Sequence, residues 1–455
     1  MKSYHFVGIG GSGMSALAQV MKSKGNSVTG SDRSYDRGLN QDLFRSLRIQ
    51  GIGLYAQDGS GVKKDTDYVV VSSAIEKGNP DIKKAKSLSL PILHRAELLA
   101  TIFNPSFGIA VGGTSGKSTV TGMISFVLEQ TKLNPTMING GVVNGYQGEE
   151  WIGNARLGSS NLMVIETDES DGSILNFSPQ VGVITNISKE HRDIEELLSL
   201  FETFARSIKG CLVINEDCPL ASKIRPQGKE ILTYGLKNSA LYKAEEIQVT
   251  PTSSQFQVHG IPFNLPLLGR HNISNALAAI AVGSSLKLHL SLIKAALERF
   301  RGIKRRLELI SRSNGISVFD DFSHNPAKIS AAIETLRGQG KRLILIFQPH
   351  GYGPTRFLLE ELAEVFNKSL SLYDYLVLLD IYDAGGTAER TISSLDLLNR
   401  IKKPKVLYCP DREMVISEVR KVSQAGDVVV VMGARDDTLT LFARRLANAF
   451  KGDEN

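Results

Sequence analysis

The sequence predicts an α/β protein with three domains, each built around a mostly parallel sheet. Short apolar segments typical of buried strands alternate with helical segments, and glycine-rich loops follow two of those strands. The length agrees, because 455 residues correspond to about three domains at roughly 150 residues each. We expect the domains to span residues 1–103, 104–303 and 304–455.

The first predicted domain begins with a buried strand at residues 4–9, a glycine turn and a helix from about Ser12 to Lys24. The segment FNPSFG, at residues 103–108, breaks the pattern and ends the domain. Between these points we expect three more strands, at residues 26–32, 67–75 and 90–94, and one helix, around Asp81 to Ser87.

A glycine-rich loop, GIGGSGM at residues 8–14, follows the first strand directly. Gly8, Gly10 and Gly13 have the spacing of a Rossmann-like dinucleotide site, and Asp32 ends the second strand, where an acid that binds ribose is expected. One interpretation is a nicotinamide-dependent oxidoreductase. The same geometry holds any diphosphate at a helix N-terminus, and an ATP-type loop follows in the second domain. We therefore favour a nucleotide-diphosphate substrate at this loop.

The second predicted domain starts with a strand, a loop and a helix that include VGGTSGKSTV at residues 111–120. The usual phosphate-loop pattern, G-x-x-x-x-G-K-[ST], requires a glycine where Val111 stands. The remaining glycines still allow backbone N–H groups to surround an anion at the start of a helix. Lys117 is placed to reach the β- and γ-phosphates, and the Ser118 hydroxyl to bind Mg²⁺. The segment therefore predicts a site for ATP and Mg²⁺ in a parallel sheet of the P-loop ATPase type.

Acidic residues follow the strand predicted at residues 162–166. Glu166 closes this strand, and we expect it to bind Mg²⁺, which prefers hard oxygen ligands. Three further acids are either additional ligands or a solvated turn: Asp168, Glu169 and Asp171.

Two more segments bring polar side chains toward the predicted nucleotide site. The strand predicted at residues 181–188 is followed by His191, at the same edge of the sheet. A neutral imidazole there would bind a second metal or orient the reacting amine, and a structural histidine is the alternative. A helix at residues 270–286 places His271 and Asn275 on one face, either for a ligand or for helix packing.

The third predicted domain resumes the alternation of strands and helices from Lys304. Each predicted strand ends in a polar loop, and parallel strands bring such loops to one edge of the sheet. The strands with their loops cover residues 315–326, 342–350, 375–382, 405–411 and 427–436.

Composition favours a cytoplasmic protein whose mild basic excess is either an ordinary solvated surface or a set of clefts for small polyanionic molecules. No uncharged apolar run reaches the roughly 18 residues of a membrane span, and the N-terminal segment does not resemble a signal peptide. The three cysteines form neither a disulfide framework nor a metal-ligand spacing. The net charge of +6 is scattered rather than gathered in a basic stripe, so we expect no nucleic-acid partner and no membrane. The protein is expected to be a monomer or a dimer.

Nine short motifs occur in an informative order: GIGGSGM, VVVSSAI, GTSGKST, ETDESD, ITNISKEH, RHNISNALAA, RRLE, DDFSHNP and FQPH. This order, nearly end to end, resembles the Mur ligases, whose own shortened phosphate loop, G-T-x-G-K-[ST], matches residues 113–118. Within the family, the chain is most similar to the alanine-adding members. The resemblance implies an ATP-dependent ligase that activates the carboxylate of a UDP-sugar, UDP-N-acetylmuramate in the leading interpretation, as an acyl phosphate. The amine of L-alanine then attacks it, in the synthesis of a peptidoglycan precursor.

The resemblance also assigns roles to individual residues. It implies a catalytic group, which consists of Lys117, His191, Arg306 and His324. It implies metal ligation by Ser118, Glu166 and His191. ATP contacts are implied for Gly113, Thr114, Ser115, Gly116, Lys117, Ser118, Thr119, His271, Asn275 and Asp321. Together with Asp32, the expected substrate-binding set comprises Gly10, Gly11, Ser12, Gly13, Met14, Ser72, Ser73, His350 and Arg356.

The chain departs from the alanine-adding pattern mostly on the side of the acceptor amine. Gly351 and Pro354 stand where those members place arginines, and MGARDD replaces their M-G-A-G-N-I. Other differences are Ser115 in the phosphate loop and Phe322, Asn325 and Lys328 in DDFSHNPAK. The alternative is therefore a divergent Mur-type ligase that adds a different amino acid or amine to a related UDP-sugar acid. A murein-tripeptide ligase is less favoured, because QPH stands where such ligases have E-P-R. A non-catalytic nucleotide-binding protein is less favoured, because Lys117 and Glu166 are present.

Overall fold

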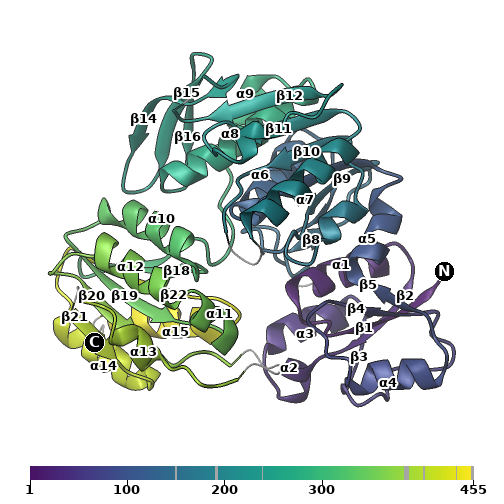
Figure 1. Ribbon diagram of the computed structural model, residues 1–455, viewed down its shortest axis with the longest axis horizontal. Helices are drawn as coiled ribbons and strands as arrows, with labels where there is room; N and C mark the ends of the chain where they lie inside the picture. The colour runs from purple at the N-terminus through teal and green to yellow at the C-terminus, as the bar shows by residue number, and fades with distance from the viewer. Residues whose placement is uncertain are drawn as a thin grey trace. The chain divides into compact units, whose positions relative to one another are not determined.

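The protein is described by a computed structural model that covers residues 1–148, 151–189, 193–237, 239–383, 389–402, 405–436 and 438–451. It divides into two compact units, Met1–Ile303 and Lys304–Asn455. In the described part of the first unit the strands form a five-stranded, an eight-stranded and a three-stranded sheet, and those of the second unit form one six-stranded sheet (Figure 1). The predicted α/β fold class is confirmed.

The five-stranded sheet has the Rossmann-like strand order β3-β2-β1-β4-β5, and all of its pairs are parallel. Its strands are β1 (Ser3–Val7), β2 (Ser27–Ser31), β3 (Gly53–Tyr55), β4 (Tyr68–Val71) and β5 (Ile92–His94). The connecting helices are α1 (Ser12–Ser23), α2 (Arg33–Asp36), α3 (Gln41–Ile49), α4 (Pro80–Ser87) and α5 (Arg95–Phe103). The order reverses beside β1, so the glycine loop that follows β1 lies at the switch point of the sheet.

The eight-stranded sheet has the order β13-β12-β11-β10-β6-β9-β7-β8, with β8 alone antiparallel to its neighbour among the described strands. Its strands are β6 (Phe107–Gly112), β7 (Thr136–Ile138), β8 (Ala155–Arg156), β9 (Leu162–Glu166), β10 (Val181–Ile184), β11 (Cys211–Asn215), β12 (Glu230–Gly235) and β13 (Tyr242–Lys243). Its helical segments are α6 (Lys117–Gln130), η1 (Ser173–Asn176), α7 (Ile194–Ser207), η2 (Ala221–Lys223), α8 (Arg270–Ser285) and α9 (Leu290–Leu297). Because β6 lies between β9 and β10, the loop after β6 is flanked by the loops after those two strands.

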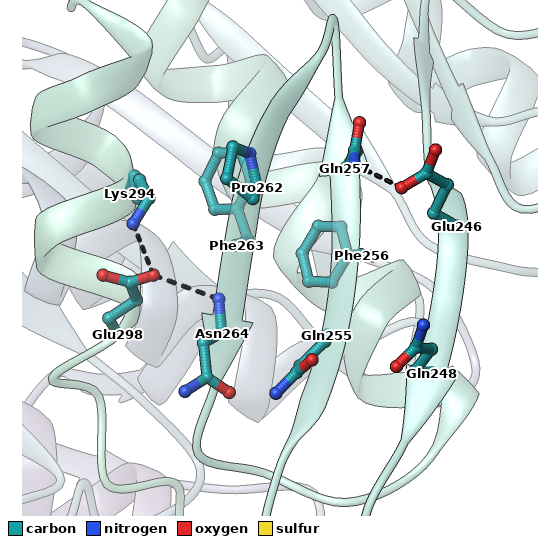
Figure 2. Close-up of a pocket in the computed structure, with 10 residues that line it drawn as sticks. All are labelled: Glu246, Gln248, Gln255, Phe256, Gln257, Pro262, Phe263, Asn264, Lys294 and Glu298. Atoms are coloured by element: carbon teal, nitrogen blue, oxygen red, sulfur yellow. Dashed lines mark hydrogen bonds and ion pairs between the residues drawn. The ribbon is translucent and has the colours of Figure 1, made fainter.

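A small antiparallel sheet completes the first unit and was not predicted from the sequence. It consists of β14 (Glu245–Val249), β15 (Ser254–Val258) and β16 (Ile261–Leu265). A two-residue turn joins the last two strands, and both of its residues, His259 and Gly260, have positive φ angles of 49° and 74°. Beside this sheet and α9 lies a shallow pocket of about 330 Å³ whose charged side chains pair with one another or with the strands (Figure 2). None of the predicted site residues lines it.

The second unit is built on a sheet of order β17-β18-β22-β19-β20-β21. Its strands are β17 (Glu308–Ser313), β18 (Ile316–Asp321), β19 (Arg342–Gln348), β20 (Tyr375–Leu378), β21 (Lys405–Tyr408) and β22 (Asp427–Gly433). Its helices are α10 (Pro326–Arg337), α11 (Tyr352–Phe357), α12 (Leu359–Ser369), α13 (Ser394–Leu398), α14 (Arg412–Val422) and α15 (Thr438–Ala449). All pairs are parallel except β17 with β18, a hairpin that the sequence analysis missed.

Apolar sequence explains which strand is central in this unit. Every residue of β22 is buried, including four consecutive valines whose side chains alternate between the two faces of the sheet. Over the residues that the structure describes, no helix has the length and hydrophobicity needed to cross a membrane.

Candidate active site

The loop between β6 and α6 has the geometry of an anion-binding site. Gly113 and Gly116 have φ angles of 133° and 84°, which favour glycine. A Cβ atom on Gly113 would lie 2.0 Å from the Thr185 hydroxyl oxygen, so the close approach of β10 also excludes any side chain there. Helix α6 begins at Lys117, directly after this turn, and directs its free N–H groups into the loop.

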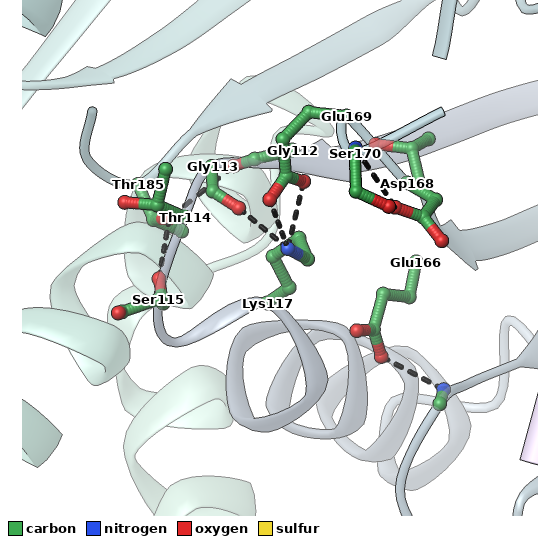
Figure 3. A network of polar contacts seen from close by, with 12 residues as sticks. Gly112, Gly113, Thr114, Ser115, Lys117, Glu166, Asp168, Glu169, Ser170 and Thr185 are labelled. Atoms are coloured by element: carbon green, nitrogen blue, oxygen red, sulfur yellow. Dashed lines mark hydrogen bonds and ion pairs between the residues drawn. The ribbon is translucent and has the colours of Figure 1, made fainter. Parts of the chain in front are cut away.

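Lys117 is held in this loop by two partners (Figure 3). Its Nζ atom donates to the carbonyl oxygen of Gly113 at 2.7 Å and to the two carboxylate oxygens of Glu169 at 2.9 and 2.7 Å. Burial alone would lower the pKa of Lys117, but the nearby carboxylates, Glu169 first, outweigh burial and raise that pKa above its ordinary value. Lys117 is therefore positively charged and fixed beside the loop.

Glu169, one of the acids whose role the sequence left open, is thus the ion-pair partner of Lys117 rather than a solvated turn residue. Its side chain is 4% exposed. The sequence analysis chose Glu166 among these acids and did not select Glu169. The position of Glu169 just after strand β9 was a usable signal.

Asn186 supports the same loop and was not singled out from the sequence. Its Oδ1 atom accepts from the Thr114 hydroxyl at 2.7 Å and from the Ser115 backbone N–H at 3.0 Å. Its Nδ2 atom donates to the Ser115 carbonyl oxygen at 3.0 Å. Asn186 lies two residues after β10, so a search for the first amide side chain after each strand would have found it.

Glu166 and Ser118 border the same backbone segment, at Gly140 and Gly141. The Glu166 carboxylate accepts from the Gly140 N–H at 2.7 Å, and a Cβ atom on Gly141 would lie 3.7 Å from the Ser118 hydroxyl oxygen. A carboxylate and a hydroxyl suit Mg²⁺, which binds through few protein ligands and keeps several waters. Within the described part of the chain no three His, Cys, Asp or Glu side chains form a metal-binding cluster, so this fit depends on those two groups.

The other residues predicted for this site lie in different environments. The Asn275 side chain lies against the phosphate loop, since a Cβ atom on Gly116 would lie 2.7 Å from its Oδ1 atom. Thr119 is buried in the first turn of α6. His271 is exposed at the start of α8. His191 lies outside the described residues.

The first glycine loop is anchored by Asp32 at the switch point of the five-stranded sheet. Asp32 Oδ2 accepts from the Gly10 N–H at 2.8 Å, and Oδ1 accepts from the Ser34 N–H at 2.7 Å. Its carboxylate therefore supports the loop that was predicted to bind the substrate. The turn after β4 closes the other side: the Ile75 N–H donates to the Ser72 carbonyl oxygen, and a Cβ atom on Gly8 would lie 2.8 Å from Ile75.

The remaining residues of the predicted substrate loop lie at the start of α1. Gly11 is its N-cap, Ser12 is exposed, and Met14 is buried in its first turn. The Arg95 guanidinium packs on Gly13, where a Cβ atom would lie 2.8 Å from it.

Polar contacts connect this first loop with the acidic segment after β9. Arg95 lies 3.8 Å from the Asp168 carboxylate. Asp171 accepts from the Ser73 hydroxyl at 3.3 Å and lies 3.8 Å from His94. Arg95, His94 and Ser73 therefore connect the first glycine loop and its surroundings with the acidic segment after β9.

In the second unit the predicted residues gather at the carboxyl ends of β18 and β19. Asp321 accepts from the backbone N–H groups of Leu307 and Ser323 at 2.7 and 2.8 Å. The His324 and His350 rings are in contact, with centroids 4.8 Å apart.

Two predicted arginines of the second unit have local contacts. The Arg306 guanidinium stacks on the ring of Phe322 at 5.0 Å. Arg356 hydrogen-bonds instead to the segment around Thr391, through the Thr391 hydroxyl and the Glu389 carbonyl oxygen. A direct role of Arg356 in substrate binding stays a prediction.

Three family models match the chain in succession: the Mur ligase family catalytic domain at residues 3–106, the Mur ligase middle domain at 111–283 and the Mur ligase glutamate ligase domain at 305–435. The UDP-N-acetylmuramate–L-alanine ligase of Thermosynechococcus vestitus is 38% identical over 95% of this chain and 93% of its own length. The enzyme of the same name from Aquifex aeolicus is 37% identical over 95% of both chains. The crystal structure of UDP-N-acetylmuramate–alanine ligase from Thermotoga maritima matches with a TM-score of 0.78 at 26% identity, over 98% of this chain and 99% of that chain.

The fold, with its phosphate loop, and these matches define an ATP-dependent ligase. The chain belongs to the Mur ligase family. The resemblance inferred from the order of the motifs is therefore confirmed.

Proposed function

We propose that this chain joins L-alanine to UDP-N-acetylmuramate, with conversion of ATP to ADP and phosphate, in the synthesis of a peptidoglycan precursor. Relatives that carry the name of this activity match nearly the whole chain. The observation that supports the chemistry most directly is the ion-paired Lys117, which is fixed at a glycine loop beside a helix N-terminus.

ATP is needed because a carboxylate is a poor acyl donor. In the proposed reaction an oxygen of the sugar carboxylate attacks the γ-phosphorus, and the bond to ADP breaks. The amine of alanine then attacks the acyl carbon and loses a proton, and phosphate leaves with the electrons of the C–O bond. Most of the rate enhancement in such transfers comes from positioning and from neutralising charge on the phosphates.

The first unit would supply these charges and positions. Residues 113–119 would surround the phosphates with N–H groups, and the Lys117 ammonium would contact the β- and γ-phosphate oxygens. Glu166 and Ser118 would hold Mg²⁺, with His191 as a further predicted ligand. When bound, this ion would neutralise charge on the phosphate oxygens.

The first glycine loop, residues 10–14, would bind the diphosphate of the UDP-sugar at the N-terminus of α1, together with Ser72 and Ser73. In the second unit we assign Asp321 to the ATP ribose, Arg306 to the phosphates and His324 to the incoming amino acid. We retain domain boundaries near residues 103 and 303.

We also place the reaction in the cytoplasm. The cysteines form no disulfide, which fits a reducing compartment: Cys211, Cys218 and Cys409 are all free.

A second candidate is a ligase of the same chemistry that adds another amine. Gly351 and Pro354 favour it, because the alanine-adding pattern has arginines at those positions. In this chain Gly351 has a φ of 69°, which favours glycine, and Pro354 lies in α11. The backbone of this segment therefore fits the glycine and the proline that the chain has at these positions.

The test is phosphate release from Mg-ATP by the purified protein, with UDP-N-acetylmuramate and a panel of amino acids that includes alanine, glycine and serine. Release that depends on both alanine and the UDP-sugar, with the amide product detected by mass spectrometry, supports the first candidate. Release with another amine but not with alanine supports the second.

A further inference from the structure

The carboxyl edge of the sheet in the second unit brings three loops together. Strand β22 lies between β18 and β19, with Asp321 paired to Met432 and Gln348 paired to Gly433. The residues that follow these strands are therefore neighbours. His324 and His350 come from the two outer loops, and their rings are in contact, so the imidazoles meet across the end of β22.

Three acids that the structure describes at this edge are already neutralised or hydrogen-bonded within the protein. Asp320 lies 3.4 Å from the Arg305 guanidinium and accepts from the Thr440 hydroxyl at 2.6 Å. Asp436 forms an ion pair with Arg412. Asp321, as described above, accepts from two backbone N–H groups.

Most guanidinium groups near this edge are also engaged. Arg305 is buried and donates to the carbonyl oxygens of Gly433 and Asp436 at 2.8 and 3.2 Å. Arg412 donates to the Thr438 hydroxyl at 2.7 Å, in addition to its ion pair.

Arg435 differs from them. It lies two residues beyond β22, is exposed, and makes no hydrogen bond or ion pair within the described part of the chain. Its φ angle is 63°, in the left-handed region that a β-carbon disfavours. The flanking residues hold this conformation, because Arg305 binds the carbonyl groups of Gly433 and Asp436 and Arg412 binds the Asp436 carboxylate. A backbone outlier held on both sides and carrying an unpaired charge is typical of a ligand contact.

We propose that Arg435 binds the α-carboxylate of the incoming amino acid and replaces the arginines that the alanine-adding pattern places at positions 351 and 354. The inference rests on the proposed function and names the recognition group for its acceptor. A guanidinium forms paired hydrogen bonds with a carboxylate, and among the described residues no acid of this edge pairs with Arg435. The adjacent imidazoles of His324 and His350 complete the polar surface that faces the amino acid.

The test compares steady-state kinetics of wild type, Arg435→Gln, Arg435→Lys and Arg435→Gly, with Arg444→Gln as a control. Arg444 is an exposed arginine on α15 in the same unit. We expect Arg435→Gln to raise the KM for alanine roughly 10- to 100-fold, as expected for the loss of a charged hydrogen-bonded contact. The KM values for ATP and the UDP-sugar should stay within about 2-fold, because those substrates do not contact Arg435.

A second acceptor substrate, which has no carboxylate, shows whether Arg435 acts through that group. L-Alaninamide lacks this group, so wild type and Arg435→Gln should use it with equal KM, while Arg435→Lys should retain part of the preference for alanine. Arg435→Gly should lose alanine affinity as Arg435→Gln does, with an unchanged or higher thermal midpoint, because glycine relieves the left-handed backbone.

An unchanged KM for alanine in Arg435→Gln and Arg435→Gly would overturn the proposal, as would an equal rise for alanine and alaninamide. If wild type does not use alanine, the proposed function fails separately, and the same comparison is made with the amino acid that drives phosphate release. If no amino acid drives release, both fail.

Discussion

Lys117 is the residue on which the proposed chemistry depends most. Its charge is fixed by Glu169 and its position by the Gly113 carbonyl group, so the ammonium needs little reorganisation to meet a phosphate. The glycines and Lys117 were predictable because the motif encodes a local strand-loop-helix geometry. The position of Glu169 after β9 made it a candidate, but the sequence could not single it out as the partner of Lys117. Three acids follow β9 within a few residues, and only the tertiary fold selects Glu169.

Lys117→Met should reduce turnover by about 10³-fold or more, because a pre-positioned charge at the phosphates is lost. The measurement is kcat from coupled ADP release, with Lys209→Met, an exposed lysine of the same unit, as the control. Turnover of Lys117→Met within about 3-fold of wild type would contradict the site assignment, which rests on placing this charge at the phosphates.

At the scale of elements, Asn325 explains one departure from the family pattern. It is the N-cap of α10, and its side chain accepts from the Lys328 N–H at 2.9 Å. Asn325→Ala should lower the free energy of unfolding by about 1 kcal/mol, while Asn325→Asp, also a good cap, should be nearly neutral. Urea unfolding monitored by circular dichroism measures both. Equal stability of the alanine and aspartate variants would show that the cap contributes nothing.

Helix α1 is joined to the eight-stranded sheet by a buried amide network. Asn154 immediately precedes β8. Its Nδ2 atom donates to the Ser12 carbonyl oxygen at 2.8 Å and to the Ser15 hydroxyl at 3.0 Å. Its Oδ1 atom accepts from Gln19 at 2.9 Å. The helix that begins at the first glycine loop is thus fixed to the sheet that carries the phosphate loop.

Asn154→Ala should cost about 1–3 kcal/mol of unfolding free energy, because the buried Gln19 amide loses one of its hydrogen-bond partners. It should also raise the KM for the UDP-sugar more than the KM for ATP, since α1 is the element displaced. Unfolding in urea and the two KM values are the measurements. Equal changes in both KM values would show that the network has no special connection to the first loop.

Most of the parallel strands and several helices, such as α1, α4 and α8, were predictable, whereas the antiparallel additions were not. Long apolar runs such as β22 define buried parallel strands from the sequence alone. Strands β14 to β16 alternate polar and apolar residues over short stretches and are exposed on one face, so their signal is weak. The turn at His259–Gly260 was the available clue.

At the scale of the whole molecule, Asp374 makes stability depend on pH. It is buried, and burial alone would raise its pKa. Hydrogen bonds from Arg337, Leu343 and Ser371 outweigh burial and hold the pKa of Asp374 below its ordinary value. A lowered folded-state pKa stabilises the fold above the unfolded-state pKa near 3.8, and this contribution is lost as pH falls through the folded-state value.

Asp374→Asn should therefore lower the free energy of unfolding by about 2 kcal/mol at pH 7. The difference from wild type should shrink as pH falls below about 4, because Asp374 takes up a proton first in the unfolded chain and only at lower pH in the folded protein. Urea unfolding across this pH range tests the linkage. A difference that stays constant with pH would mean that the charge of Asp374 does not contribute.

In the proposed reaction, this Mur ligase couples ATP cleavage to amide formation between UDP-N-acetylmuramate and L-alanine. Phosphate release from Mg-ATP, measured with each substrate omitted in turn, tests this coupling. We expect release only when ATP, the UDP-sugar and alanine are all present, with one amide formed per phosphate. Phosphate release in the absence of alanine would contradict this reaction. So would an amide product that forms from another amine when alanine is absent.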